Sequence, residues 1–226
     1  MSMGGDRALA GKVVVVTGAG SGVGRAVALA LADAGARTVL VARSADAIGE
    51  TAREIAARGG EALAVPCDVA DEAAVAAMAD AVSARFGGAD GAVLAAGIGR
   101  FGPVETYPLA DWNATLATNL TGAFLVSRAL LPSMRARGGG WIVAIGSGAG
   151  KQGYANLAAY SASKFGLIGF MQALGAEVGG DGIRTAVVNP GSILTPFGGK
   201  DVADAVLWLL RQPDRAWTQE MNLWPF

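Results

Sequence analysis

Strand-like and helix-like segments alternate almost from one end of this chain of 226 residues to the other. The first pair shows the pattern: the valine-rich run at residues 12–17 (KVVVVT) precedes an Ala/Leu-rich segment at residues 23–34, which stops at Gly35. A continuous β-branched run is typical of a strand that is buried on both faces. Repeated alternation predicts a parallel sheet with right-handed crossovers and helices on both faces. We therefore expect a doubly wound α/β fold with about seven strands.

The other strands and helices are expected in the same order. Further strands are predicted at residues 37–42, 62–66, 89–95, 141–145, 184–188 and 221–223. Further helices are predicted at residues 45–58, 71–86, 109–137, 157–178 and 202–211. No linker, repeat or low-complexity stretch divides the chain, so residues 1–226 are expected to form a single domain, with residues 1–8 as a flexible N-terminus. In such sheets ligands bind at the carboxyl ends of the strands.

The composition excludes several kinds of chemistry. The chain has no histidine and one cysteine, Cys67, so it has no Ser-His-Asp or Cys-His triad, no His-ligated zinc and no disulfide framework. Proton transfer must therefore use Tyr, Lys, Asp, Glu or Ser. The 18 basic and 19 acidic residues form no basic stripe, and no nucleic-acid or membrane partner is expected. Because no signal peptide and no run of about 20 apolar residues is recognisable, we expect a cytoplasmic protein.

A glycine-rich turn, residues 17–24 (TGAGSGVG), lies between the first strand and the first helix. Glycines let the backbone approach a ligand closely, and the N-terminus of the following helix presents free N–H groups to a pyrophosphate. The turn lacks the Gly-Lys-Ser/Thr end of a P-loop, which disfavours a nucleoside triphosphate. Glycines there could simply form a turn, but the position after the first strand favours a dinucleotide. The expected contacts are Gly18, Gly20, Ser21, Gly22, Val23 and Gly24.

The end of the second predicted strand indicates which dinucleotide binds. A carboxylate there would hold the ribose hydroxyls of NAD(H) and repel a 2′-phosphate. This chain instead has Ala42-Arg43-Ser44, which offers a guanidinium and a hydroxyl to a phosphate. Arg43 could also be a surface residue at the start of a helix. We expect NADP(H) in preference to NAD(H).

A candidate proton-transfer pair opens the predicted helix at residues 157–178. Tyr160 precedes Lys164 by one helical turn, so both lie on the same helical face. A phenol has a pKa of about 10 and is a poor base at neutral pH unless a cation stabilises the phenolate. Lys164 can supply that charge. Pairs at this spacing also occur on solvated helix faces, so the pair needs support from other residues.

Two further polar residues lie where they could assist that pair. Ser147 follows the predicted strand at residues 141–145, where its hydroxyl could bind a substrate oxygen or simply form a turn. Asn119 interrupts the long predicted helix at residues 109–137. A mid-helix Asn could bind water or a backbone carbonyl and distort the helix locally, or could be exposed.

Together these residues make the chain resemble the short-chain dehydrogenase/reductase family from about Leu9 to Phe226. The matching segments are TGAGSGVG (17–24), CDV (67–69), AAG (95–97), Asn119, Ser147, YSASK (160–164) and Asn189-Pro190-Gly191. The resemblance implies a Rossmann fold and an NADP-dependent oxidoreductase that acts on a carbonyl or secondary alcohol. Tyr160 would exchange a proton with the substrate oxygen, which Ser147 would orient. Lys164 would lower the tyrosine pKa, hold the nicotinamide ribose and pass protons to a water kept by Asn119.

The resemblance also implies the remaining contacts. The adenine would lie at Asp68 and Val69, the middle of the cofactor along Ala96 and Gly97, and the nicotinamide at Pro190, Gly191, Ile193 and Thr195. The substrate wall is expected from residues 98–108, 149–154 and 193–200, which contribute Phe101, Tyr107, Gln152, Tyr154 and Phe197. Many members carry a longer loop where this chain has only residues 192–200. The short segment predicts an open site for an uncharged small-molecule carbonyl or alcohol.

The family comparison also raises departures and alternatives. Leu94-Ala95 replaces a pair of asparagines whose amides brace the strand end, so support there is expected from packing.

The long helices pair between subunits in this family, which implies a homodimer or homotetramer. A non-catalytic NAD(P)-binding regulatory protein could keep the fold, but the complete set of Ser147, Tyr160 and Lys164 argues against it. A nucleotide-sugar epimerase would need a C-terminal substrate domain, for which no residues are left.

Overall fold

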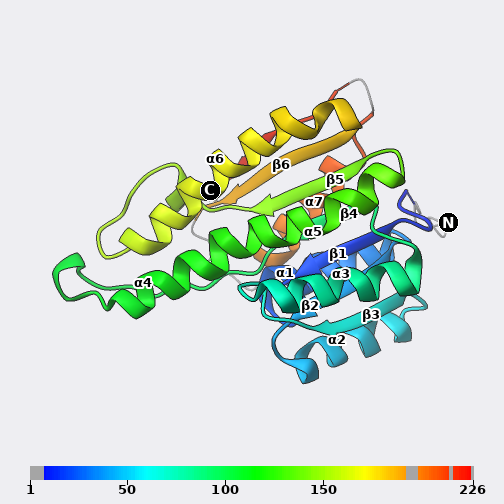
Figure 1. Cartoon of the computed structure of the whole chain (residues 1–226), viewed down its shortest axis with the longest axis horizontal. Helices are drawn as coiled ribbons and strands as arrows, with labels where there is room; N and C mark the ends of the chain where they lie inside the picture. The colour runs from blue at the N-terminus through cyan, green and yellow to red at the C-terminus, as the bar shows by residue number, and fades with distance from the viewer. Residues whose placement is uncertain (1–7, 192–197, 214–215, 225–226) are drawn as a thin grey trace.

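The strands form one parallel sheet, in a computed structural model that describes residues 8–191, 198–213 and 216–224. Its order is β3-β2-β1-β4-β5-β6-β7, and each neighbouring pair is parallel (Figure 1). The strands are β1 (Val13–Thr17), β2 (Arg37–Ala42), β3 (Glu61–Pro66), β4 (Gly91–Leu94), β5 (Gly140–Ile145), β6 (Ile183–Pro190) and β7 (Glu220–Leu223). The predicted doubly wound sheet of seven strands is confirmed.

Helices cover both faces of the sheet. One face carries α1 (Gly22–Asp33), α2 (Ala45–Ala57) and α7 (Gly198–Leu210), and the other carries α3 (Glu72–Phe86), α5 (Gly122–Ala136) and α6 (Ala158–Val178). The predicted boundaries differ from these by a few residues. The largest difference is that α7 begins at Gly198, four residues before the predicted start.

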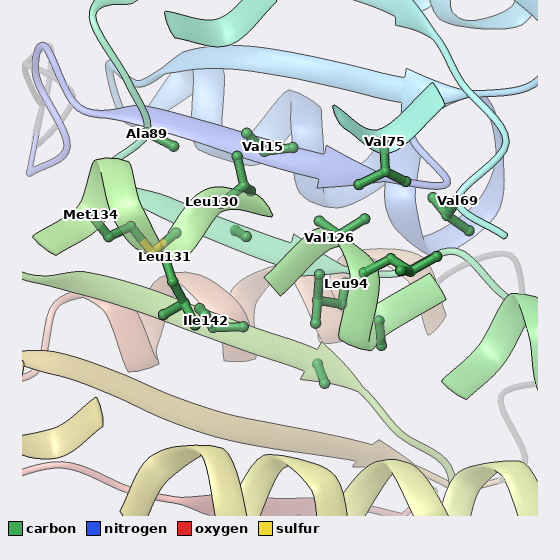
Figure 2. Close-up of a cluster of buried hydrophobic side chains, with 14 of the residues drawn as sticks. Val15, Val69, Val75, Ala89, Leu94, Val126, Leu130, Leu131, Met134 and Ile142 are labelled. Carbon is green, nitrogen blue, oxygen red and sulfur yellow. The ribbon is translucent and has the colours of Figure 1, made fainter. Parts of the chain in front are cut away.

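The alternation of valines in β1 builds a hydrophobic layer on each side of the sheet. Val13 and Val15 enter the layer under α3, α5 and α6, whereas Val14 and Val16 enter the layer under α1, α2 and α7. Burying one such side chain stabilises the fold by about 1.5–3 kcal/mol, which explains why the central strand is continuously apolar. Figure 2 shows the first layer, with Val15, Val75, Leu94, Val126, Leu130 and Ile142 packed together.

The long predicted helix near the middle of the chain contains a local irregularity. It starts as α4 (Leu109–Leu116), passes through a π-helical turn η2 (Ala117–Thr121) and continues as α5. Of the two possibilities that the sequence left open for Asn119, a local distortion of the helix is the one observed. By length and composition, Leu109–Ala136 is apolar enough to cross a membrane, but half of its most apolar window is buried inside the fold, as in a core helix.

The carboxyl ends of the strands meet at one edge of the sheet. The strand order reverses between β1 and β4, because β2 and β3 lie on one side of β1 and β4 to β7 lie on the other. A crevice is expected at such a switch point. The segments that follow β1, β4 and β5, and Gly191 after β6, lie at this edge. Short 3-10 turns in the described connections are Val104–Thr106 after β4, Gly148–Gly150 after β5 and Gly179–Asp181 before β6.

Candidate active site

A cleft of about 300 Å³ opens at the switch point, where the ends of β1, β2 and β4 meet. It is lined by the glycine-rich turn, the end of β2, the segment after β3 and the segment after β4. The predicted cofactor residues that line it are Gly18, Gly20, Ser21, Arg43, Ser44, Asp68, Val69, Ala96 and Gly97. Residues predicted from four separate parts of the sequence therefore come together at one site.

A second cleft of about 420 Å³ lies beside the first, at the ends of β5 and β6. The two clefts share Gly97 and Ile98, so they are neighbouring parts of one groove. The predicted residues that line the second cleft are Val23, Gly97, Ser147, Tyr160, Lys164, Pro190 and Gly191. Ile193 and Thr195 lie outside the described residues. Gly22, Gly24 and Asn119 are not among the described residues that line either cleft.

The glycine-rich turn leaves the N-terminus of α1 open to a ligand. A β-carbon on Gly24 would lie 2.3 Å from the carbonyl oxygen of Gly18, so only glycine lets the helix pack against the turn. Ser21, the N-cap of α1, makes no capping bond with its side chain, and the first turn has no acidic residue. In contrast, Ser44 and Asp71 cap α2 and α3 with side-chain oxygens. The free amides of α1 therefore suit the pyrophosphate of a dinucleotide.

Lys164 lies buried beside Tyr160 in the second cleft. Its Nζ atom donates a 2.7 Å hydrogen bond to the carbonyl of Ile145 and lies 5.7 Å from the centroid of the Tyr160 ring. Burial lowers the pKa of Lys164 from 10.5 to about 8, so the amine is still mainly a cation at neutral pH. In the part of the chain that is described, the Tyr160 hydroxyl makes no hydrogen bond. It is therefore free to bond a substrate oxygen.

Asn119 is buried, and the π-helical turn aims its amide at two other segments. Its Oδ1 accepts a hydrogen bond from Ile98 N at 2.8 Å, and its Nδ2 donates to Ile98 O at 2.9 Å and to Ser163 Oγ at 3.0 Å. The possibility that Asn119 is simply exposed is excluded. Its amide connects the segment after β4 to the second turn of α6, at Ser163 next to Lys164. Because both amide hydrogens are used, the water-holding role that the resemblance implies would fall to the backbone carbonyl.

Ser147 forms the turn that the sequence allowed and also lines the second cleft. Its Oγ accepts a 3.1 Å hydrogen bond from Ala149 N and starts the 3-10 turn Gly148–Gly150. The same residue lines the second cleft. Because this bond uses only an acceptor site, the hydroxyl hydrogen remains available to a substrate oxygen.

Support for the segment after β4 differs from the sequence expectation. Thr17 Oγ1 accepts hydrogen bonds from Ala95 N and from Ala96 N, each at 3.0 Å. Together with Asn119, which holds Ile98, this hydroxyl replaces the missing asparagine amides. The expectation that packing provides the support was therefore incomplete, although Leu94 does pack in the core (Figure 2). Thr17 was missed because it occupies the last position of a strand, where threonine is common for its β-branched shape.

The expected substrate wall is only partly present. Phe101 lines the second cleft, with its ring edge-on to Tyr160, the centroids 6.1 Å apart and the planes at 85°. Tyr107, Gln152 and Tyr154 are not among the described lining residues, and Phe197 lies outside them. Tyr107 instead donates a 2.8 Å hydrogen bond to Arg100 O and braces the loop that carries Phe101.

This arrangement is that of a known family. A family model described as short chain dehydrogenase matches residues 12–205, well over half of the chain. The chain belongs to the short-chain dehydrogenase/reductase family. Its similar relatives include dehydrogenases and reductases, so the family is one of oxidoreductases.

Three members of the family illustrate the similarity. The D-threitol dehydrogenase of Mycolicibacterium smegmatis is 43% identical over 200 residues, which cover 88% of this chain and 77% of that protein. A metagenomic short-chain oxidoreductase solved in complex with NADP is 41% identical, with a TM-score of 0.91 over 97% of this chain and 99% of that one. A 7α-hydroxysteroid dehydrogenase complexed with NADH and 7-oxo glycochenodeoxycholic acid is 29% identical, with a TM-score of 0.91 over 99% and 96%.

Proposed function

We propose that this protein is an NADP(H)-dependent oxidoreductase that interconverts an uncharged carbonyl compound and its alcohol, with Tyr160 as the general acid and base. The observation that carries the proposal is the juxtaposition of Tyr160 with the buried cation of Lys164 in a cleft that continues into the dinucleotide groove. A phenol beside a desolvated ammonium group suits proton transfer near neutral pH. The chain has no histidine that could take this role.

The groove contains residues that fit each part of the cofactor. The free amides at the start of α1 would hold the pyrophosphate, Asp68 and Val69 the adenine, and Lys164 the nicotinamide ribose. Pro190 and Gly191 line the second cleft, where the nicotinamide would lie, with Ile193 and Thr195 expected beside it. When bound, NADP(H) supplies or accepts the hydride.

The choice of NADP(H) rests on Arg43. This residue is exposed at the rim of the first cleft, and among the described residues it has no hydrogen-bond or ion-pair partner. No acidic residue occupies the end of β2, where one would select NAD(H). The similar metagenomic oxidoreductase binds NADP, whereas the 7α-hydroxysteroid dehydrogenase binds NADH, so both cofactors occur among relatives of this fold.

The proton path follows from the hydrogen-bonding capacity of three side chains. In reduction, the carbonyl oxygen gains negative charge and takes the hydroxyl proton of Tyr160. Ser147 donates its hydroxyl hydrogen to the same oxygen and orients it. The Lys164 ammonium group stabilises the phenolate that remains. In oxidation the phenolate takes the proton back from the alcohol.

A panel of aldehydes, ketones and secondary alcohols with NADP(H) tests the proposal. We expect turnover of at least one uncharged compound, and a loss of about 100-fold or more in Ser147→Ala because one donor to the developing oxyanion is removed. Ser83→Ala, an exposed serine on α3, is the matched control and should keep its activity. Binding of NADPH without turnover of any compound would favour the alternative, a non-catalytic dinucleotide-binding protein. The homodimer or homotetramer and the cytoplasmic location remain predictions.

A further inference from the structure

Two exposed aromatic side chains lie at or next to the second cleft: Phe101 lines it, and Trp224 lies against Gly191, which lines it. Phe101 follows β4 and has 63% of its surface exposed, and Trp224 follows β7 and has 55% exposed. Large apolar side chains are usually buried, so two of them beside one catalytic cleft need an explanation. They follow the carboxyl ends of two parallel strands and therefore lie at the same edge of the sheet, although they are far apart in the sequence.

Phe101 lies over the part of the cleft where the substrate oxygen would bind. A β-carbon on Gly99 would lie 2.7 Å from the tip of the Phe101 ring, so the ring rests on this glycine. Its other contact is the edge-to-face packing against Tyr160. Phe101 therefore forms a wall directly next to the proposed proton donor.

Trp224 rests on two glycines that border the cleft. A β-carbon on Gly191 would lie 2.5 Å from the indole, and one on Gly148 would lie 2.8 Å from it, so any larger residue would displace the ring. Gly191 lines the cleft, and Gly148 follows Ser147 directly. The backbone before the indole is fixed, because Gly191 N donates a 2.7 Å hydrogen bond to Leu223 O.

The charges around this cleft do not suit an ionic substrate. Of the described residues that line it, only Tyr160 and Lys164 are ionisable, and both are assigned to proton transfer. Two cations of the loops after β4 and β5 are paired, Arg100 with Asp111 and Lys151 with Glu220. No free cation is left among these groups to hold a carboxylate or a phosphate.

We propose that the substrate is an uncharged ketone, or its secondary alcohol, that carries a flat apolar substituent held between Phe101 and Trp224. This proposal rests on the proposed carbonyl chemistry. An aromatic or similar planar group would gain contact area and favourable ring geometry with both side chains. A small polyhydroxylated ketone would gain neither and would find few hydrogen-bond partners on these walls.

Three ketone probes test the proposal: acetophenone, cyclohexyl methyl ketone as its non-planar match, and dihydroxyacetone. With NADPH, the wild type should show the highest kcat/KM for acetophenone and the lowest for dihydroxyacetone. Trp224→Ala should lower kcat/KM for acetophenone by about tenfold, mainly through KM, as expected for the loss of one apolar wall. Trp224→Phe should restore most of it, and dihydroxyacetone should respond little to either variant.

The control is Trp208→Ala, because Trp208 is a similarly exposed indole (52%) on α7 that, unlike Trp224, is not among the side chains nearest to Gly148 or Gly191. Calorimetric binding of acetophenone to the protein loaded with NADP⁺ gives a readout that needs no turnover. Binding that weakens in Trp224→Ala without any turnover would support the aromatic clamp and refute the proposed reaction. A wild type that prefers dihydroxyacetone would overturn the clamp and leave the reaction standing. So would a Trp224→Ala variant whose preference and affinity for acetophenone equal those of the wild type. Absence of both turnover and binding would overturn both.

Discussion

The Nζ atom of Lys164 lies 5.7 Å from the centroid of the Tyr160 ring, one turn further along α6. Burial lowers the pKa of this amine to about 8. The positive charge that would stabilise a phenolate is therefore held in the interior at the expense of folding stability. Conflict of this kind between stability and activity is common at catalytic sites.

Replacement of the buried Lys164 amine should separate its effect on folding stability from its effect on turnover. Lys164→Met should abolish measurable turnover but raise the free energy of unfolding by about 1–2 kcal/mol. A pKa lowered from 10.5 to about 8 corresponds to roughly 3 kcal/mol, of which roughly 1 kcal/mol is offset because Ile145 O loses its donor. Urea denaturation near neutral pH measures the change. Lys12→Met, at an exposed lysine that lines neither cleft, should leave turnover unchanged, and a clearly destabilised Lys164→Met would contradict this account.

The same burial predicts how stability depends on pH. Between about pH 8 and pH 10.5 the unfolded chain keeps the lysine proton, whereas the folded chain has lost it. The wild type should therefore gain stability with rising pH across this window, relative to Lys164→Met, by up to roughly 1.4 kcal/mol per pH unit. Below pH 8 both states are protonated and the difference between the two proteins should be constant. Urea curves of both proteins across this range give the comparison, and a difference that does not change would mean that Lys164 titrates normally.

Thr17 should be important for stability although it touches no predicted reacting atom. Thr17→Val keeps the shape of the side chain but leaves the amides of Ala95 and Ala96 without their acceptor. We expect a loss of about 1–3 kcal/mol in the free energy of unfolding. Thr17→Ser keeps the hydroxyl and should lose less. Equal stability of the valine variant and the wild type would show that the two hydrogen bonds contribute nothing.

The fold was predictable because its pattern is local. The valine run of β1 and the glycine turn after it identify the central strand and the first crossover within a few residues of sequence. A local distortion at Asn119 was one of two possibilities that the sequence left open, and the structure shows it as a π-helical turn.

The contacts that complete the site were not predictable in the same way. Asn119 bonds Ser163, which is 44 residues away, and Thr17 bonds Ala95, which is 78 residues away. Trp224 depends on two glycines from different loops. A single sequence contains no pattern for such pairs, because they arise only when the crossovers bring distant strand ends to one edge.

Arg43 should determine the preference between the two nicotinamide cofactors. Arg43→Ala should weaken NADPH binding by about 10- to 100-fold, the range expected for a lost charge-assisted hydrogen bond, and should leave NADH binding almost unchanged. Arg53→Ala, at an exposed arginine on α2 that is outside both clefts, is the matched control. Titration calorimetry with each cofactor measures the effect. A wild type that binds NADH more tightly than NADPH would refute the assignment of Arg43.

The most direct test of the central claim is the turnover of Tyr160→Phe with a carbonyl substrate that the wild type reduces. The variant removes one hydroxyl, which among the described residues makes no hydrogen bond, so folding and NADPH affinity should be preserved. Because the proton donor is gone, kcat should fall by about 100- to 10,000-fold. Preserved NADPH binding with this loss of kcat is the result that we predict. Turnover within a few fold of the wild type would contradict the assignment of Tyr160 as the proton donor.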